Sequence, residues 1–234
     1  MLQLYFYKRI CKHVRFGYFS SGGRNFLGRV CVNGRIRGNK RLFTKIDFFR
    51  RTNQFGIIYK IIHDSRRTAF VGLVIYKNGL ASYIILSSNF YFNKLIYSGP
   101  YILNDPKFIL QEGWALPLKS LPLFSTISNM ELAPFKGFQL ARSAGVSGIL
   151  VSKDLNFAYI KLNSKWQVKI LLESYAVKGA VSNNRHNCNH LGSAGAARAL
   201  GYKSKVRGVA KNPCDHPHGG GNGKKPKPVN PVTP

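Results

Sequence analysis

The stretch GIIYKIIHDSRRTAFVGLVIYKNGLASYIIL, residues 56–86, decides the fold. It holds three short runs, GIIYKIIH, TAFVGLVIY and LASYIIL, rich in the β-branched and aromatic residues that strands favour. Turn residues separate the runs, and Asn78-Gly79 is a strong signal for a two-residue hairpin. Together with LFTKIDFF at 42–49, the stretch predicts a small antiparallel barrel or sandwich.

A second group of strand-like runs follows a less regular connector at 87–113. Between residues 125 and 173 the runs are STISNMEL, GFQLARSAG, GILVSKD, FAYIKLN and WQVKILLE. They predict a second small β unit, so the fold class that we expect is all-β. Trp114 and Trp166 are expected in the core or between the barrels, rather than as surfaces on which bases stack.

From residue 181 the strand pattern is lost, and residues 192–223 are GSAGAARALGYKSKVRGVAKNPCDHPHGGGNG. One short helix is expected around Ala194–Leu200. The rest has almost no apolar periodicity and cannot bury a core of its own, yet its residues are too particular for a simple linker. We therefore expect a segment that folds on a partner, which the glycines at 219–221 would let the backbone approach closely.

The net charge is +28, from 36 Lys and Arg residues against 8 Asp and Glu residues. Residues 1–45 carry eleven of these cations and no acid, 46–177 carry fifteen against seven acids, and 178–234 carry ten against one. Such an excess would repel itself without a polyanion, so nucleic acid is the leading partner. Both ends are expected to be disordered alone and to order on that partner. A membrane is disfavoured, because no run of 18 apolar residues occurs.

The four cysteines are widely spaced and form no CxxC pair. Neither a disulfide framework nor a zinc ribbon is therefore expected. A weaker alternative is a metal on which the alternating His/Cys triplets at 186–190 and at 214–218 converge.

The segment RGVAKNPCDHPHGGG at 207–221 resembles the signature of the universal large-subunit ribosomal protein L-two family, in its bacterial or organellar form. Further resemblances follow in the order of the family: SGGRNFLGRV at 21–30, DFFRR at 47–51, WALPLKSLPLFSTISNMELAPFKGFQLARSAG at 114–145 and PVTP at 231–234. Two departures stand out. Asn39 lies where the family usually has His, and Ala199 lies where it often has Trp.

The family resemblance implies a domain order. An OB-fold barrel is expected at 42–113 and an SH3-like barrel at 114–180. Long basic extensions are expected on either side, at 1–41 and at 181–234.

The residues expected to contact RNA are cations that can reach phosphates, together with polar and glycine residues of the motif. In the N-terminal extension they are Arg24, Arg29, Arg35, Arg37, Lys40 and Arg41. In the barrels they are Arg50, Arg51, Arg66, Arg67, Lys136 and Arg142. In the C-terminal extension they are Arg198, Lys203, Lys205, Arg207, Lys211, Asn212, His216, His218, Gly219, Gly220 and Gly221. No residue is expected to be catalytic or to ligate a metal.

The resemblance implies a structural constituent of the large ribosomal subunit, which binds its rRNA near the peptidyl-transferase region and supports subunit association and translation. Its partners would be large-subunit rRNA and other large-subunit ribosomal proteins, without DNA or membrane, and without a cofactor other than RNA-associated Mg²⁺. The alternative is a free RNA chaperone or nucleic-acid-binding protein outside the ribosome. An enzyme that uses Asp215, His216 and His218 is disfavoured, because this tail has no core to hold a pocket.

Residues with A/T-rich codons, namely Phe, Tyr, Ile, Asn and Lys, are abundant in the chain. This favours an organelle-encoded protein of the mitochondrial matrix and its ribosome, with the plastid as the alternative. The first twenty residues are basic and aromatic; an import presequence there is the weaker interpretation, because such peptides are richer in Ser and Ala.

Overall fold

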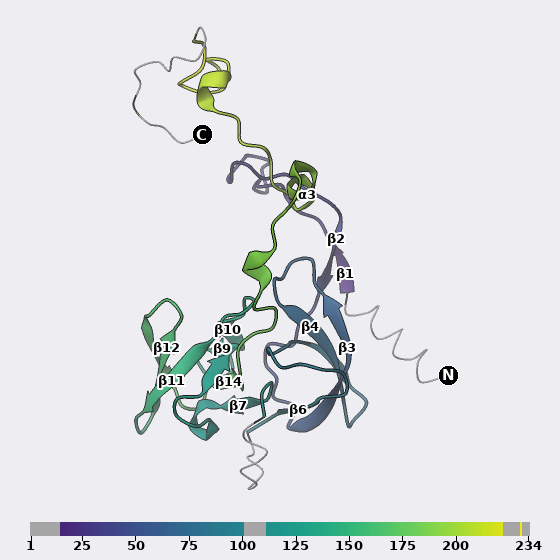
Figure 1. The fold of residues 1–234 in the computed structure, drawn as a ribbon, viewed down its shortest axis with the longest axis vertical. Coiled ribbons are helices and arrows are strands. Elements are labelled where there is room, and N and C mark those ends of the chain that lie inside the picture. Colours follow the sequence, from purple (N-terminus) through teal and green to yellow (C-terminus); the bar gives the residue numbers. More distant parts are fainter. Residues whose placement is uncertain (1–14, 101–110, 222–229, 231–234) are drawn as a thin grey trace, which may run out of the picture. The chain divides into compact units, whose positions relative to one another are not determined.

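The computed structural model describes residues 15–100, 111–221 and 230, which form two compact units. The first unit contains residues 15–16, 42–100 and 111–189, and the second contains 17–41, 190–221 and 230. Figure 1 traces both units along the chain.

Most of the regular structure is strand. The first strands are β1 (Arg15–Tyr18), β2 (Arg41–Thr44), β3 (Gln54–His63), β4 (Phe70–Tyr76), β5 (Ala81–Ile85) and β6 (Leu95–Ser98). They are followed by β7 (Ala115–Pro117), β8 (Thr126–Ser128), β9 (Met130–Glu131), β10 (Phe138–Leu140), β11 (Gly148–Lys153), β12 (Phe157–Leu162), β13 (Gln167–Leu171) and β14 (Tyr175–Lys178). The helical elements are η1 (Leu118–Ser120), η2 (His186–Cys188), α3 (Ala194–Ala199) and η3 (Gly208–Ala210).

Ten strands form one continuous sheet in the order β13-β12-β11-β8-β14-β7-β6-β3-β4-β5. Its neighbours pair antiparallel except β6 and β7, which meet in parallel at Ser98 and Ala115. β9 pairs with β10, and β1 pairs with β2, in separate two-stranded ladders. The expected all-β class is confirmed: an OB-fold barrel with strands β3 to β6 precedes an SH3-like barrel with strands β7 to β14.

Strand β4 is central to the first barrel, and both of its faces are buried. Val71 and Leu73 pack in one core cluster with Tyr83, while Val74 packs in a second cluster with Ile58. A strand that is buried on both faces needs a nearly continuous hydrophobic run rather than an alternating one. The sequence FVGLVIY supplies such a run.

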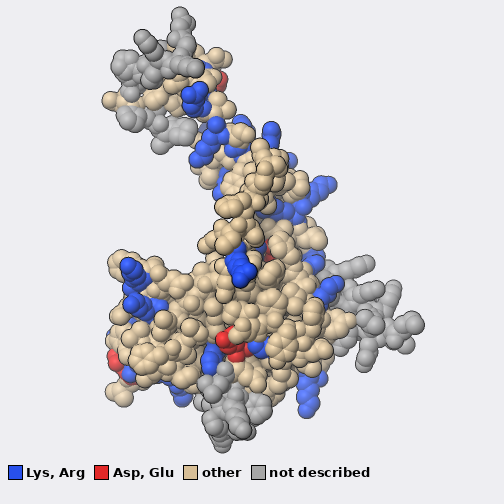
Figure 2. Space-filling model, in the orientation of Figure 1, with Lys and Arg blue, Asp and Glu red and all other residues tan. Residues whose placement is uncertain are grey.

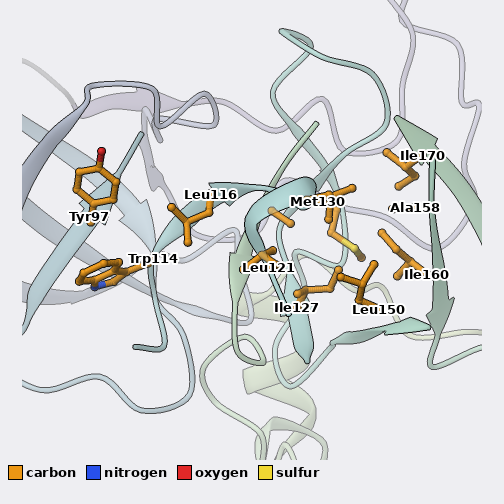
Figure 3. Close-up of a cluster of buried hydrophobic side chains, with 12 residues drawn as sticks. Tyr97, Trp114, Leu116, Leu121, Ile127, Met130, Leu150, Ala158, Ile160 and Ile170 are labelled. Atoms are coloured by element: carbon orange, nitrogen blue, oxygen red, sulfur yellow. The ribbon is translucent and has the colours of Figure 1, made fainter. Parts of the chain in front are cut away.

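The second barrel is filled by aliphatic side chains from β8, β9 and β11 to β13, and Figure 3 shows this cluster continuing to Tyr97 and Trp114. Trp114 is buried, as expected, and its ring lies 5.5 Å from that of Tyr97 and 5.9 Å from that of Phe55. Tyr97 and Phe55 belong to first-barrel strands, so these aromatic contacts join the two cores.

The expectation for Trp166 is wrong, because its side chain is 77% exposed. Trp166 lies in the tight turn between β12 and β13, where Lys165 has a φ of +70° and the Leu162 N–H donates to the Trp166 carbonyl at 2.9 Å. Trp166 thus closes the turn directly before β13, and its side chain points into solvent rather than into a core.

A buried carboxylate joins the second barrel to the DFFRR segment at 47–51. Glu131 is fully buried and accepts hydrogen bonds from the N–H groups of Gly137 and Tyr175, at 3.1 and 3.0 Å. Arg51 pairs with it at 2.8 Å, and its guanidinium lies 3.9 Å from the ring centroid of Phe135. Every contact of this carboxylate is therefore made inside the protein.

The second unit is held together differently, by backbone contacts between the N- and C-terminal extensions. The Ile36 N–H donates to Gly201 and the Asn39 N–H donates to Ala199, each at 3.0 Å, and Arg35 bridges to Tyr202. No hydrophobic side chain among the described residues of this unit is buried. The expected absence of an apolar core is confirmed there, but the structure pairs two extensions that the sequence analysis treated separately.

The expected short helix is confirmed as α3. The Ser193 hydroxyl caps it by accepting from the Ala196 N–H at 3.3 Å, and the Arg198 guanidinium lies in its last turn. Both features are typical helix-end signals.

We predict that Glu131→Ala destabilises the barrels by about 3–5 kcal/mol, because it leaves Arg51 unpaired and two buried N–H groups without an acceptor. Urea unfolding of the full chain measures this change. The exposed Glu173 provides the control, since Glu173→Ala should change the midpoint little. Equal midpoints for the two variants would contradict the structural role of Glu131.

Candidate nucleic-acid interface

The surface is dominated by positive charge. Lys and Arg side chains are spread over both units on the face drawn in Figure 2, where few Asp or Glu side chains appear. With 36 cations against 8 acids, most cations have no carboxylate of their own. The surface therefore suits a polyanion.

On the barrels, several of the predicted cations gather around the half-buried ring of Phe48. The guanidinium groups of Arg67 and Arg142 lie 5.1 and 5.2 Å from the ring centroid of Phe48. The Phe138 N–H donates to the Phe48 carbonyl at 2.9 Å, which fixes the turn that carries the exposed Lys136. Two further cations lie beside this group: Lys136 on that turn, and Arg66, whose guanidinium lies 5.2 Å from the ring centroid of Phe43. We call Phe48, Arg67 and Arg142, together with Arg66 and Lys136, the Phe48 cluster.

Like charges repel one another within the Phe48 cluster. Burial lowers the pKa of Arg67, Asp64 opposes this effect, and the neighbouring Arg142 and Arg66 lower the pKa further. A phosphate placed beside these groups would relieve the repulsion. Arg66 and Arg142 are exposed and can make that contact.

Arg50 and Arg51 do not have the surface role that the sequence suggested. Arg50 is buried, with a φ of +45°, and donates to the Ser98 hydroxyl and the Gly113 carbonyl at 3.1 and 3.0 Å. Arg51 is 20% exposed and is engaged by Glu131. These two arginines are structural, because their guanidinium groups bond to Ser98, Gly113 and Glu131 inside the protein.

In the second unit, most predicted cations are exposed to solvent: Arg24, Arg29, Arg35, Arg37, Lys40, Arg198, Lys203, Lys205 and Arg207. Arg35 from this set, and the less exposed Arg41, also have partners within the unit. The Arg35 guanidinium lies 4.5 Å from the ring centroid of Tyr202, and Arg41 donates to the Leu200 carbonyl at 2.5 Å. Arg35 and Arg41 therefore help to join the two extensions as well as adding charge.

The motif folds into a compact turn, which we call the 207–220 loop. The His216 N–H donates to Asn212 at 3.2 Å, the Gly219 N–H donates to His216 at 2.9 Å, and the Gly220 N–H donates to Lys211 at 3.2 Å. A Cβ on Gly219 would lie 2.3 Å from the Asn212 carbonyl oxygen. Gly219 thus serves a contact within the protein, whereas Gly221 and Asn212 are exposed.

His216 is the buried centre of this loop. Its Nδ1 accepts from the His218 N–H at 3.0 Å, and a Cβ on Gly208 would lie 2.3 Å from its ring. Burial lowers the pKa of His216, and His218 and Lys211 lower it further, which favours the neutral ring. The sequence predicts that His216 contacts RNA; in the structure its buried ring instead packs inside the loop.

A cavity of about 730 Å³ opens beside the loop, within the second unit. Its walls include Lys203, Lys205, Arg207 and Lys211, with Asp215 as the one acid. Four cations around a space of this size make it suitable for phosphate groups.

Comparison with known proteins gives one consistent result. The family described as Ribosomal Proteins L2, RNA binding N-terminal domain, matches residues 12–98, and its C-terminal domain counterpart matches 111–234. The large ribosomal subunit protein uL2 of Orientia tsutsugamushi strain Ikeda is 41% identical over 227 residues, or 97% of this chain and 81% of its own.

The chain belongs to the ribosomal protein L2 family. The uL2 proteins of Caulobacter sp. strain K31 and Legionella pneumophila strain Corby are 40% and 42% identical. These matches cover 93% and 92% of this chain, and each covers 76% of the relative. The resemblance inferred from the sequence is thereby confirmed at the level of the family.

Sequence reasoning missed two aromatic residues of this L2 surface. Phe135 is 72% exposed and stacks under Arg51, and Tyr202 stacks under Arg35. Each of these aromatic residues is followed directly by a lysine, in a segment that lacks the alternating apolar and polar residues of a strand. This combination is the sequence signal that could have identified them.

The other expectations concern metals and membranes. No group of three or more metal-ligating side chains comes together within residues 15–100, 111–221 and 230. In the same part of the L2 chain, Cys31, Cys188 and Cys214 are free and exposed. No helix of the described residues is long and apolar enough to cross a membrane.

Gly208→Ala should open the 207–220 loop, because its new Cβ would meet the His216 ring at 2.3 Å. Gly192→Ala is a matched control in the same unit, since no atom lies within 4 Å of its Cβ position. We expect faster amide exchange across 207–220 for Gly208→Ala alone, measured by mass spectrometry in assembled subunits. Identical exchange for both variants would show that His216 does not hold the loop.

Proposed function

We propose that this chain is a structural constituent of the large ribosomal subunit. In this role it binds large-subunit rRNA near the peptidyl-transferase region and supports subunit association and translation. The observation that carries the proposal is the 41% identity to a large-subunit protein over 97% of the chain. Other large-subunit proteins would be its neighbours, and Mg²⁺ would come with the RNA.

The geometry supports contact with the RNA backbone in both units. Exposed cations line the second unit and the cavity beside the 207–220 loop, while the barrels offer the Phe48 cluster. Lys and Arg that neutralise phosphates release counterions, so they provide affinity without a sequence code. The barrels would give these contacts a fixed frame.

The chemistry of peptide transfer is assigned to the RNA rather than to this chain. A general base needs a free lone pair directed at its substrate. The Nδ1 of His216 already accepts from His218, and the Nε2 of His218 lies 3.1 Å from the Asn230 carbonyl oxygen. The first contact occupies the Nδ1 lone pair of His216 and supports a positioning role for that ring, and the second orients the His218 ring.

We further propose that the ribosome is mitochondrial and that the chain is encoded in the organelle. The support is the composition, with 16 Phe and 12 Tyr residues among 234 and many Ile, Asn and Lys. Cell fractionation followed by immunoblotting tests this placement, and recovery in the plastid or the cytosol would refute it.

Sedimentation of the tagged full chain with large subunits tests the ribosomal role. We expect the chain in the large-subunit peak at low salt, and we expect its affinity for purified large-subunit rRNA to fall linearly on a log–log plot against salt. The double substitution Lys203→Gln with Lys205→Gln should reduce the slope by about 1–2. Equal binding to rRNA and to heparin, with no protein in the subunit peak, would favour the free RNA chaperone.

A further inference from the structure

Residues 24–30 of the N-terminal extension form a tight hairpin. Arg24 and Val30 pair as an antiparallel bridge, and the Asn25 N–H donates to the Arg29 carbonyl at 2.9 Å. The Gly28 N–H donates to Asn25 at 3.1 Å, and Gly28 has a φ of +78°. This is a three-residue loop with glycine in the left-handed position that such loops require.

Side chains make the hairpin more rigid. The Asn25 carboxamide oxygen accepts from the Arg29 N–H at 2.9 Å, and the Arg24 guanidinium donates to the Gly28 carbonyl at 2.8 Å. At its base, a Cβ on Gly23 would lie 2.4 Å from the Val32 carbonyl oxygen. These local contacts define the shape of the tip.

Two large apolar side chains stand on this ordered tip. Phe26 is 95% exposed and Leu27 is 64% exposed. They lie between Arg24 and Arg29, in a region without a single acid among residues 1–45. A phenyl ring held in water does not stabilise the protein's own fold. We therefore expect this ring to contact a partner with an apolar surface, and the flanking arginines to contact negative charge on the same partner.

Unpaired RNA has both properties. Its bases stack on aromatic side chains, its phosphates attract arginine, and apolar wedges such as Phe and Leu insert between base steps. An acidic protein pocket is the other surface that could receive this tip. The absence of hydrogen-bonding side chains at 26–28 and the uniform positive charge around them favour the base and its phosphates.

We propose that Phe26 stacks on an unstacked base of large-subunit rRNA, while Leu27 packs beside it and Arg29 contacts an adjacent phosphate. The proposal rests on the ribosomal function above and adds a specific mode of contact to it.

The test measures binding of the full chain to large-subunit rRNA purified from the same organism, over a series of salt concentrations. Phe26→Ala should weaken binding about tenfold or more with an unchanged salt slope, because stacking releases no counterions. Phe26→Tyr should bind like the original chain. Arg29→Gln should reduce the slope by about one.

Phe19→Ala is the matched control, because Phe19 is 82% exposed in the same unit but lies outside the hairpin. An equal loss for Phe19→Ala and Phe26→Ala would overturn the proposal, as would normal rRNA binding by Phe26→Ala. Normal rRNA binding by Phe26→Ala with loss of one neighbouring protein from the subunit would assign the tip to a protein partner. Failure of the unsubstituted chain to bind the rRNA would instead overturn the ribosomal function itself, and the stacking contact with it.

Discussion

Electrostatic repulsion among the many Lys and Arg side chains is the constraint on which the rest of the structure depends. The chain has 8 acids for 36 cations, and the fold uses several of those acids internally. Glu131 accepts from Arg51 and two N–H groups, Asp64 accepts from the Arg66 N–H, and Asp47 accepts from the N–H groups of Phe49 and Arg50. Carboxylates engaged in this way do little to neutralise the Lys and Arg side chains at the surface. An external polyanion is therefore needed to offset the repulsion among these side chains.

The two units reach an ordered state by different physical means. The barrels bury apolar side chains from strands that pair over most of their length. The second unit relies on hydrogen bonds and on glycines that allow close backbone approach; a Cβ on Gly38 would lie 2.6 Å from the Ala199 carbonyl oxygen. Asn39 and Ala199, where the chain departs from the usual family residues, bond to each other through their backbones, so the two departures occur at one junction.

The sequence predicted the strands that carry long apolar or alternating runs, but it missed β1, β6, β7 and β14. These strands have three or four residues each, and no local pattern reveals their long-range pairing; the pairing of β6 with β7 links the two barrels. The cations of the extensions were found because charge is visible in composition. Arg50 and His216 were misjudged because burial depends on tertiary contacts: a turn in the DFFRR segment directs Arg50 inward, and the fold of the 207–220 loop encloses His216.

Amide hydrogen exchange of the full chain, free and in assembled large subunits, tests most directly the claim that the barrels fold alone while the second unit depends on RNA. The account predicts that amides of β3, β4, β11 and β12 are protected in both states. It also predicts that protection at 17–41 and 190–221 rises strongly in the subunit, because this unit has no apolar core among its described residues. Equally strong protection of both units in the free protein would contradict it.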